Sequence, residues 1–263
     1  QQGRTVTVPM PFERLARVLR FPRNEGALLI LAACPGMGKT AMMLEMVREV
    51  AGARIVSDDG RERQGSALVF SLEMPADQLI RRMAGQWAGL DMRKVEAGHG
   101  SRDEMDALQR GYEYVSGLRL WIDDTPGRTV SDIRRRVRRH IAQHGSVDMV
   151  AVDYLGLIDH RPLQGERGDQ CISRGVRDLR NEARSNGYLQ VLLSQLNRGV
   201  ESRADKRPML SDLRDSGGIE EHAEAVVMLY RDEYYTREMS AYPGECDVLV
   251  RKNRHGPSGT VVL

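Results

Sequence analysis

The chain has 263 residues, of which 41% are hydrophobic, so it is long enough to bury the core of one large α/β domain. Its 39 basic and 37 acidic residues leave a formal net charge of +2, so overall charge identifies no nucleic-acid, membrane or acidic partner. Three widely spaced cysteines without a CxxC pair argue against a disulfide framework or zinc site, and neither a membrane span nor a signal peptide is evident.

Short apolar segments of strand length recur along the chain. Their continuous apolar character is typical of strands buried on both faces. We expect strands at Ala27–Ala33, Ala67–Leu72, Leu118–Ile122, Met149–Val152, Leu189–Ser194, Ala225–Tyr230 and Val248–Val250.

Segments with helical spacing separate these strands. They are Thr40–Val50, Pro75–Ala88, Val130–His144 and Ile172–Ser185, with Thr129 or Ser131 suited to cap the third of them. The remaining stretches 57–66, 160–169 and 197–208 carry Gly, Asp, Arg and Pro without apolar periodicity, and we expect loops there. The alternation predicts an α/β fold with a mostly parallel twisted sheet flanked by helices.

The first strand runs directly into a glycine-rich turn and a helix. Its sequence Cys34-Pro35-Gly36-Met37-Gly38-Lys39-Thr40 fits a Walker A loop. Such glycines let backbone N–H groups turn toward phosphate oxygens, while the helix N-terminus favours negative charge. We expect a nucleotide to bind at Pro35, Gly36, Met37, Gly38, Lys39, Thr40 and Ala41.

Two side chains of this loop have separate expected roles. Lys39 reaches the β- and γ-phosphates, and the Thr40 hydroxyl serves Mg²⁺. One position departs from the GxxxxGKT pattern, because Ala33 replaces the leading glycine. A glycine-rich turn that contains Lys-Thr by chance is the alternative.

Two acidic residues follow predicted strands. Asp153 comes directly after Met149–Val152, where a Walker B carboxylate holds the water shell of Mg²⁺. Glu73 follows Ala67–Leu72 beside the expected nucleotide crevice and is our candidate general base for hydrolysis. From its position alone, Glu73 could equally be an acid that favours the N-terminus of the next helix.

Five segments, taken in chain order, resemble the successive motifs of the DnaB-family helicase C-terminal domain. They are Phe70–Met74, Val152–Ile158, Ser194–Arg198, Lys206–Glu220 and Lys252–Gly259. The Ser-Gln-Leu-Asn-Arg and Asp-Leu-Arg-Asp-Ser-Gly-Gly-Ile-Glu runs are much more specific than any P-loop. The resemblance covers the chain from about Ala27 onward and implies a RecA-like P-loop NTPase.

The resemblance also implies roles for individual residues. Gln195 looks like the sensor that links the γ-phosphate state to the DNA loops. Lys252 and Arg254 resemble the pair that reaches the nucleotide of the neighbouring subunit, with Arg254 as the finger on the transferred phosphoryl group. With Lys39 and Glu73, these three form the expected catalytic set.

The family's DNA-binding loop falls at Arg214, Asp215 and Gly217. Gly217 and the glycine after it would let backbone N–H groups approach phosphates. An ordinary ion pair between Arg214 and Asp215 is the alternative. Asp215 stands where the family usually has Glu, and His222 and Glu224 stand where it usually has Asp.

On this resemblance, residues 27–263 form the motor domain, and residues 1–26 form an N-terminal segment, either a linker or a subunit-contact arm. The chain begins at Gln1 and ends in a strand-like run, so we expect it to be a piece of a longer protein. The implied activity is ATP- or other NTP-driven, Mg²⁺-dependent 5′ to 3′ translocation on single-stranded DNA by a homo-hexamer. Primase and a helicase loader are implied partners, in the cytoplasm of a bacterial cell or as a phage protein within one.

Two rival functions stay open. One is a RecA-fold module, a loader or switch, that binds ATP with little or no hydrolysis. The other is a RecA-like recombinase that forms open filaments and exchanges strands without unwinding. The complete set Lys39, Thr40, Glu73, Asp153 and Arg254 disfavours the first, and the Asp212–Glu220 run disfavours the second.

Three further features suggest structure more than function. His140 and His144 have metal-ligand spacing, but no third ligand is evident, so a solvated helix face is favoured over zinc. The basic run 134–139 could bind DNA or an acidic partner, although an exposed outer helix is favoured. Trp87 and Trp121 are expected to be packing residues.

Overall fold

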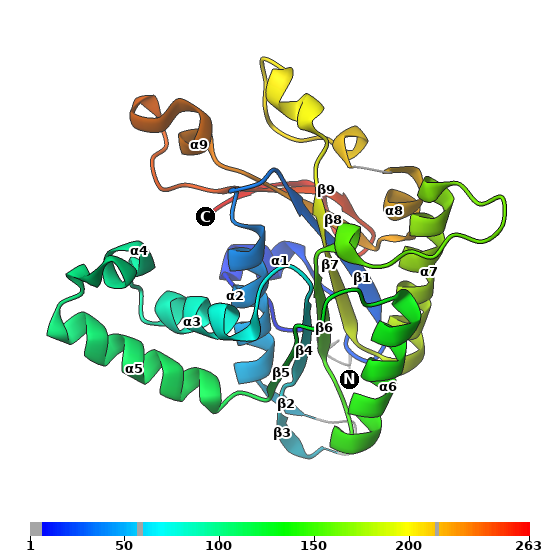
Figure 1. The fold of residues 1–263 in the computed structure, drawn as a ribbon, viewed down its shortest axis with the longest axis horizontal. Helices are drawn as coiled ribbons and strands as arrows, with labels where there is room; N and C mark the ends of the chain where they lie inside the picture. Colours follow the sequence, from blue (N-terminus) through cyan, green and yellow to red (C-terminus); the bar gives the residue numbers. More distant parts are fainter. Residues whose placement is uncertain (1–6, 57–59, 214–215) are drawn as a thin grey trace, which may run out of the picture.

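The computed structural model describes residues 7–56, 60–213 and 216–263. Within these residues the core is an eight-stranded sheet (Figure 1). Its strands are β1 (Ala27–Ala33), β4 (Ala67–Ser71), β5 (Leu120–Asp123), β6 (Met149–Asp153), β7 (Leu189–Gln195), β8 (Ala225–Tyr230), β9 (Asp247–Asn253) and β10 (Gly259–Val262). They lie in the order β10-β9-β8-β1-β7-β6-β4-β5.

The sheet is parallel from β8 to β5, and β9 and β10 extend it antiparallel. The predicted mostly parallel sheet is therefore confirmed, with strand bounds that differ by no more than a few residues. A separate antiparallel hairpin consists of β2 (Arg54–Val56) and β3 (Glu62–Gln64). Part of the predicted loop 57–66 is thus a strand, because its backbone pairs with β2.

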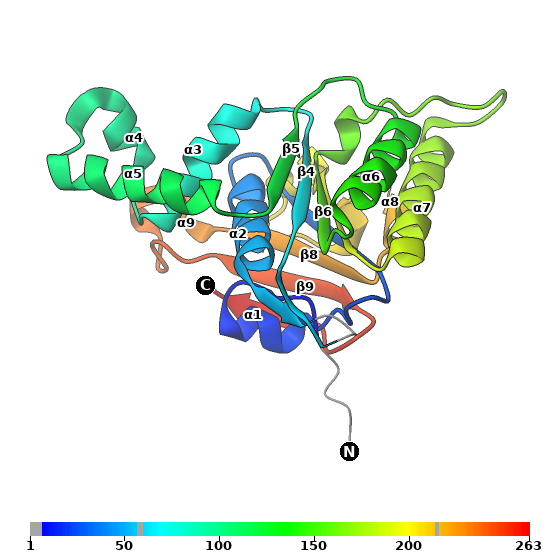
Figure 2. The same cartoon turned by 90° about the horizontal axis from the view of Figure 1, so that it is seen from below.

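Helices cover both faces of the sheet (Figures 1 and 2). The α-helices of the described residues are α1 (Glu13–Val18), α2 (Lys39–Gly52), α3 (Ala76–Trp87), α4 (Met92–Lys94), α5 (Arg102–Ser116), α6 (Val130–His144), α7 (Gly168–Asn186), α8 (Ser216–His222) and α9 (Asp232–Thr236). Helix α2 packs on one face, and α6 and α7 lie on the other. Thr129 caps α6 through a capping box with Asp132, as its sequence predicts.

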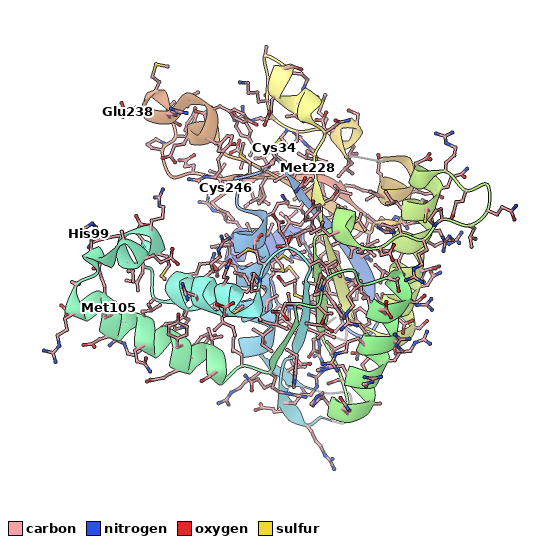
Figure 3. All side chains as sticks on the ribbon, viewed as in Figure 1. Cys34, His99, Met105, Met228, Glu238 and Cys246 are labelled. Atoms are coloured by element: carbon pink, nitrogen blue, oxygen red, sulfur yellow. The ribbon has the colours of Figure 1, made fainter. Side chains whose placement is uncertain are left out.

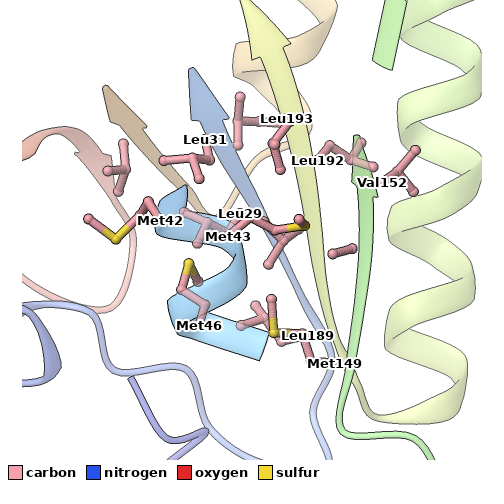
Figure 4. Close-up of a cluster of buried hydrophobic side chains, with 14 of the residues drawn as sticks. Leu29, Leu31, Met42, Met43, Met46, Met149, Val152, Leu189, Leu192 and Leu193 are labelled. Atoms are coloured by element: carbon pink, nitrogen blue, oxygen red, sulfur yellow. The ribbon is translucent and has the colours of Figure 1, made fainter. Parts of the chain in front are cut away.

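One part of the hydrophobic core lies where α2 meets the central strands, and another lies under α6 and α7 on the opposite face. Every residue of β1 is buried, and methionines of α2 fill the space above it (Figure 4). The unbranched methionine side chain suits this space, because it can follow the irregular surface left by neighbouring leucines. Helix α2 therefore covers one face of the strand that leads into the glycine-rich turn, and α7 packs against the other face.

A pair of antiparallel helices, α3 and α5, projects from the sheet beyond α2. His99 and Met105 mark its far end (Figure 3). Trp87 stacks on Tyr114 of α5 with ring centroids 5.1 Å apart, so Trp87 is a packing residue as expected. None of the helices in the described part of the chain is both long and apolar enough to cross a membrane.

Residues 7–26 pack onto this same core. Val8, Leu15, Leu19 and Phe21 are buried, and the Val8 N–H donates to the Phe21 carbonyl at 2.8 Å. The division of the chain at residue 27 stays a prediction. Cys34, Cys171 and Cys246 have free thiols.

Candidate active site

The glycine-rich turn between β1 and α2 has the backbone that the sequence predicts. Gly36 and Gly38 have φ angles of 77° and 93°, a region that glycine adopts without steric cost. Helix α2 begins at Lys39, directly after Gly38. Its first N–H groups are therefore available to an anion at the turn, as the predicted nucleotide site requires.

Ala33 does not disturb this turn. It is the last residue of β1, is fully buried and lies opposite Gln195 of β7, so its backbone is extended rather than left-handed. Its carbonyl oxygen accepts a hydrogen bond from Lys39 Nζ at 3.4 Å. The departure from the usual glycine thus falls where alanine is acceptable.

Thr40 and Asp153 come together across the sheet. Thr40 Oγ1 donates to Asp153 Oδ2 at 2.8 Å, which joins the first turn of α2 to the end of β6. A hydroxyl and a carboxylate are hard oxygen ligands of the kind that Mg²⁺ prefers, and Mg²⁺ normally takes few protein ligands together with phosphate oxygens. The two residues therefore fit a Mg²⁺ site.

Charge and burial act together on this cluster. Burial raises the pKa of Asp153, and the negative charge of Glu73 raises it further. Burial lowers the pKa of Lys39, while the charges of Asp153 and Glu73 raise it. Glu73 is exposed just beyond the end of β4 and acts electrostatically on both residues. The structure thus groups Lys39, Thr40, Asp153 and Glu73 at the carboxyl edge of the sheet.

Gln195 connects this edge to a more distant segment. It ends β7 beside Ala33, and it lines a cavity of about 170 Å³ with Tyr154 and Ile219. Directly after it, Leu196 bridges to Leu213, and the N–H of the next residue donates to the Asp212 carbonyl at 2.8 Å. The expected sensor is therefore tied to the backbone that precedes the expected DNA-binding loop.

Arg214 and Asp215 of that loop lie outside the described residues. Gly217 lies in the first turn of α8 rather than in an open loop. A Cβ at the following Gly218 would lie 2.0 Å from Ser173 Oγ, so this glycine lets α8 pack closely on α7. Close helix packing is a role for Gly218 that the sequence did not reveal.

Lys252 and Arg254 lie at the opposite edge of the sheet from the glycine-rich turn. Strand β9 runs antiparallel to β8, and Asn253 pairs with Ala225, the first residue of β8. Lys252 Nζ donates to the Glu220 carbonyl at 2.6 Å, and the Arg254 guanidinium to the Glu221 carbonyl at 3.0 Å. Both cations therefore lie at the amino edge of the sheet, whereas Lys39 of the same chain lies at the carboxyl edge, at the other end of the strands.

Glu224 is a structural residue that the sequence did not identify. It is buried, accepts the Leu28 N–H at 2.8 Å and forms an ion pair with Arg180 at 2.6 Å. These bonds anchor the start of β1 to α7. In the sequence, Glu224 stood out only as a departure from the family pattern. Its structural role could not be predicted, because its partners are distant along the chain.

The prediction of a solvated face for His140 and His144 is wrong for His140. Its side chain is buried, and its ring packs edge-on against Trp121 with centroids 4.4 Å apart. The indole ring of Trp121 covers this part of α6, so Trp121 is a packing residue as expected. No group of three or more potential metal ligands occurs among the described residues.

The basic run 134–139 is an outer helix surface, as expected, but it is more fully paired than predicted. Arg134 and Arg138 both form ion pairs with the buried Glu182 of α7, at 3.0 and 2.6 Å. Arg136 lies 3.6 Å from Asp123. Much of the positive charge therefore stabilises the contact between α6 and the rest of the domain.

Comparisons with known proteins agree on one family. The family described as DnaB-like helicase C terminal domain matches residues 8–263, so the likeness begins earlier than the expected Ala27. The chain is 37% identical to "Replicative DNA helicase DnaC" of Bacillus subtilis and 36% identical to "Replicative DNA helicase DnaB" of Geobacillus stearothermophilus. Each alignment covers 100% of this chain and 55% of the relative, so the chain spans about half the length of these proteins.

Solved structures give the same result. A structure described as an ATPase domain superposes with a TM-score of 0.87 at 31% identity, over 100% of this chain and 89% of that one. A structure titled "The Structure Of A DnaB-Like Replicative Helicase And Its Interactions With Primase" has a TM-score of 0.87 at 32% identity, over 99% of this chain and 60% of that one. The fold is RecA-like, and the chain belongs to the DnaB-like helicase C-terminal domain family.

Proposed function

We propose that this chain is the ATP-hydrolysing motor domain of a ring-shaped replicative DNA helicase that moves along single-stranded DNA. The observation that carries the proposal is the division of the catalytic groups between two edges of one sheet. Lys39, Thr40, Asp153 and Glu73 lie at the carboxyl edge, whereas Lys252 and Arg254 lie at the amino edge. Such a division suits a site that is completed between subunits.

At the carboxyl edge, the residues divide the work of hydrolysis. The N–H groups of the glycine-rich turn bind the phosphates, and Lys39 neutralises charge at the β- and γ-phosphates. Thr40 and Asp153 would hold Mg²⁺, which neutralises charge that develops on the phosphate oxygens. Glu73 orients the attacking water and accepts its proton.

At the amino edge, Arg254 acts on the nucleotide of the adjacent subunit, with Lys252 beside it. A guanidinium in this role stabilises the charge on the transferred phosphoryl group and is worth about 10³–10⁵ in rate. In this chain both cations rest on carbonyl oxygens of α8, the helix that follows the expected DNA-binding loop. Head-to-tail contacts form a ring when the rotation between neighbouring subunits closes, and the ring proposed here is a homo-hexamer.

The DNA step depends on the segment that follows β7. Gln195 reads the γ-phosphate state, and the bridge from Leu196 to Leu213 passes the change to Arg214, Asp215 and Gly217. Backbone and cationic contacts to phosphates give binding that is nearly independent of sequence and weakens with salt. By likeness to its relatives, the assembly moves 5′ to 3′ and works with primase and a helicase loader.

The test is ATP turnover as a function of protein concentration, with and without a single-stranded oligonucleotide, while light scattering follows the mass. We expect turnover per chain to rise cooperatively with assembly and with DNA. The Lys39→Ala protein should assemble without turnover. Turnover that is independent of concentration, or absent despite tight ATP binding, would instead support an ATP-binding module without helicase activity.

A further inference from the structure

The segment 231–246, which we call the β8–β9 excursion, leaves the sheet next to the glycine-rich turn. Strand β8 pairs with β1, and both strands end at the carboxyl edge, so the excursion begins beside the residues that follow β1. Helix α9 lies in it, beyond the strand ends and on the same side as α2 (Figures 1 and 2). Cys34 of the turn and Glu238 of the excursion are labelled in Figure 3.

Tyr234 of α9 touches the glycine-rich turn directly. A Cβ placed on Gly36 would lie 2.8 Å from Cε2 of Tyr234, so the aromatic ring occupies the space that any larger residue at Gly36 would need. The Tyr234 side chain is nevertheless 47% exposed. An aromatic surface therefore stands open at the rim of the phosphate-binding turn.

The surrounding residues hold this ring in place. Tyr234 makes an edge-to-face contact with Tyr235 at 5.2 Å, and Lys206 Nζ lies 4.6 Å from the centre of the Tyr235 ring. Asp232 Oδ2 accepts hydrogen bonds from Thr236 at 2.9 Å and from Ser240 at 2.8 Å, which fixes the short helix and the turn after it. A ring that is already fixed loses little freedom when a ligand stacks on it.

The position of the ring matches the part of a nucleotide that the turn itself does not bind. The N–H groups of the turn, Lys39 and Thr40 are suited to phosphate groups, and none of them can recognise a base. When phosphates occupy the turn, ribose and base extend past its rim. Each nucleobase has a flat π-face, and stacking on an aromatic ring is favourable whatever the base.

We propose that Tyr234 is the stacking platform for the base of the nucleotide bound at Gly36–Thr40. This inference rests on the proposed ATP site and adds the group that binds the base. Stacking requires a base, so Tyr234 favours nucleoside triphosphates over inorganic polyphosphate. Stacking does not depend on the hydrogen-bond donors and acceptors of the base, so Tyr234 does not select one base over another. The site therefore accepts ATP and GTP alike.

Tyr234→Ala, Tyr234→Phe and Tyr242→Ala test the proposal. Tyr242 is a matched control, because it is an exposed tyrosine of the same excursion. Isothermal titration would give the Kd of each protein for ATP, GTP and inorganic tripolyphosphate with Mg²⁺. For Tyr234→Ala we expect the Kd for ATP and for GTP to rise about tenfold, and the Kd for tripolyphosphate to stay unchanged. Tyr234→Phe and Tyr242→Ala should match the wild type.

Three outcomes would overturn the inference. If Tyr234→Ala weakens tripolyphosphate as much as ATP, the ring supports the turn and not the base. Unchanged affinity for all three ligands would mean that the ring contacts no ligand. If the wild type and Lys39→Ala bind ATP equally, the proposed ATP site itself fails, and the inference fails with it. Thermal unfolding of each variant without ligand would verify that the fold is intact.

Discussion

Thr40 Oγ1 and Asp153 Oδ2 lie 2.8 Å apart, although Thr40 is in the helix that follows β1, Asp153 ends β6, and β7 lies between these two strands. The glycine-rich turn carries Thr40 over the intervening strand end, and Asp153 rises from the end of β6 to meet it. In a parallel sheet, crossover connections bring the carboxyl ends of distant strands to one edge. The hydrogen bond therefore fixes the two residues that fit Mg²⁺ before any ligand binds.

Asp153→Asn should remove most of the Mg²⁺-dependent activity. The amide keeps the size of the carboxylate and can still accept from Thr40, but it has no negative charge for the cation. We expect turnover to fall about 100-fold or more, since such charge stabilisation is worth several kcal/mol. ATP binding measured in EDTA should be nearly unchanged. Thr40→Ser, which keeps the hydroxyl, is the control, and an unaltered Mg²⁺ dependence in Asp153→Asn would contradict this assignment.

Glu73→Gln should separate binding from hydrolysis. Glu73 is exposed, so the substitution should leave the fold and the Kd for ATP nearly unchanged. Loss of a general base lowers turnover by about 10²–10⁴-fold. Asp77→Asn is the matched control, because Asp77 is an exposed acid in the first turn of α3. Full turnover in Glu73→Gln, or an equal loss in Asp77→Asn, would support a role for Glu73 at the helix N-terminus alone.

The central strands and the phosphate-binding turn could be predicted because their signals are local. The continuous apolar run Ala27–Ala33 and the glycines after it define strand, turn and helix start within a few residues. Helix α5 gives no such signal. It buries only Leu108, Gly111 and Val115, and a Cβ at Gly111 would lie 2.5 Å from the Ala84 carbonyl oxygen. Because glycine has no apolar side chain, a buried helix face that is built around Gly111 does not produce a recognisable apolar periodicity in the sequence.

The parts of the site that depend on distant residues could not be predicted from local patterns. Tyr234 touches Gly36 only because β8 pairs with β1, and Glu224 meets Leu28 for the same reason. His140 was wrongly expected to face solvent, because nothing in its own helix shows that Trp121 covers it. The roles of Lys252 and Arg254 come from family likeness and stay a prediction, and the strand register shows only that both residues lie at the amino edge of the sheet.

Arg254 should act between subunits, which a mixing experiment can test. Arg254→Ala should lower turnover by about 10³-fold or more. Lys39→Ala alone should also be inactive. When the two proteins are mixed and assembled at equal amounts, about a quarter of the head-to-tail interfaces combine an intact Lys39 with an intact Arg254. Turnover should therefore reappear on mixing.

The double variant Lys39→Ala, Arg254→Ala is the control for this experiment. A mixture of the double variant with Lys39→Ala contains no intact Lys39, and a mixture with Arg254→Ala contains no intact Arg254. No complete interface can form in either mixture, so neither should regain turnover. If the single variants regain nothing on mixing although light scattering shows joint assembly, Arg254 does not act on a neighbouring nucleotide.

Glu224 should be critical for stability. Its carboxylate is buried and accepts from the Leu28 N–H and from Arg180. Glu224→Ala leaves the partly exposed Arg180 guanidinium and the buried Leu28 N–H without their acceptor, which we expect to cost about 3 kcal/mol of unfolding free energy. Glu224→Asp should cost less, since it keeps the charge. Urea unfolding gives these values, with the exposed Glu221→Ala as the control; equal stability of both alanine variants would refute this role.

His140 should make the fold sensitive to mild acid. Burial lowers its pKa from the ordinary 6.5 to about 4, and the nearby charges of His144, Arg136 and Arg119 act in the same direction. The unfolded chain therefore binds a proton between pH 6.5 and 4 that the folded chain does not accept. Stability from this residue is fully present above pH 6.5 and is lost as the pH falls toward 4.

This loss can be isolated by substitution with glutamine, which does not titrate. Between pH 6.5 and 5.5, the unfolding free energy of the wild type should fall by about 1 kcal/mol more than that of His140→Gln. His144→Gln is the control, because His144 is exposed on the same helix; it should retain most of the wild-type fall, since burial of His140 is the main cause and the charge of His144 a smaller one. Parallel pH profiles for the wild type and His140→Gln would mean that His140 is protonated in the folded chain, and that water reaches its ring despite the cover of Trp121.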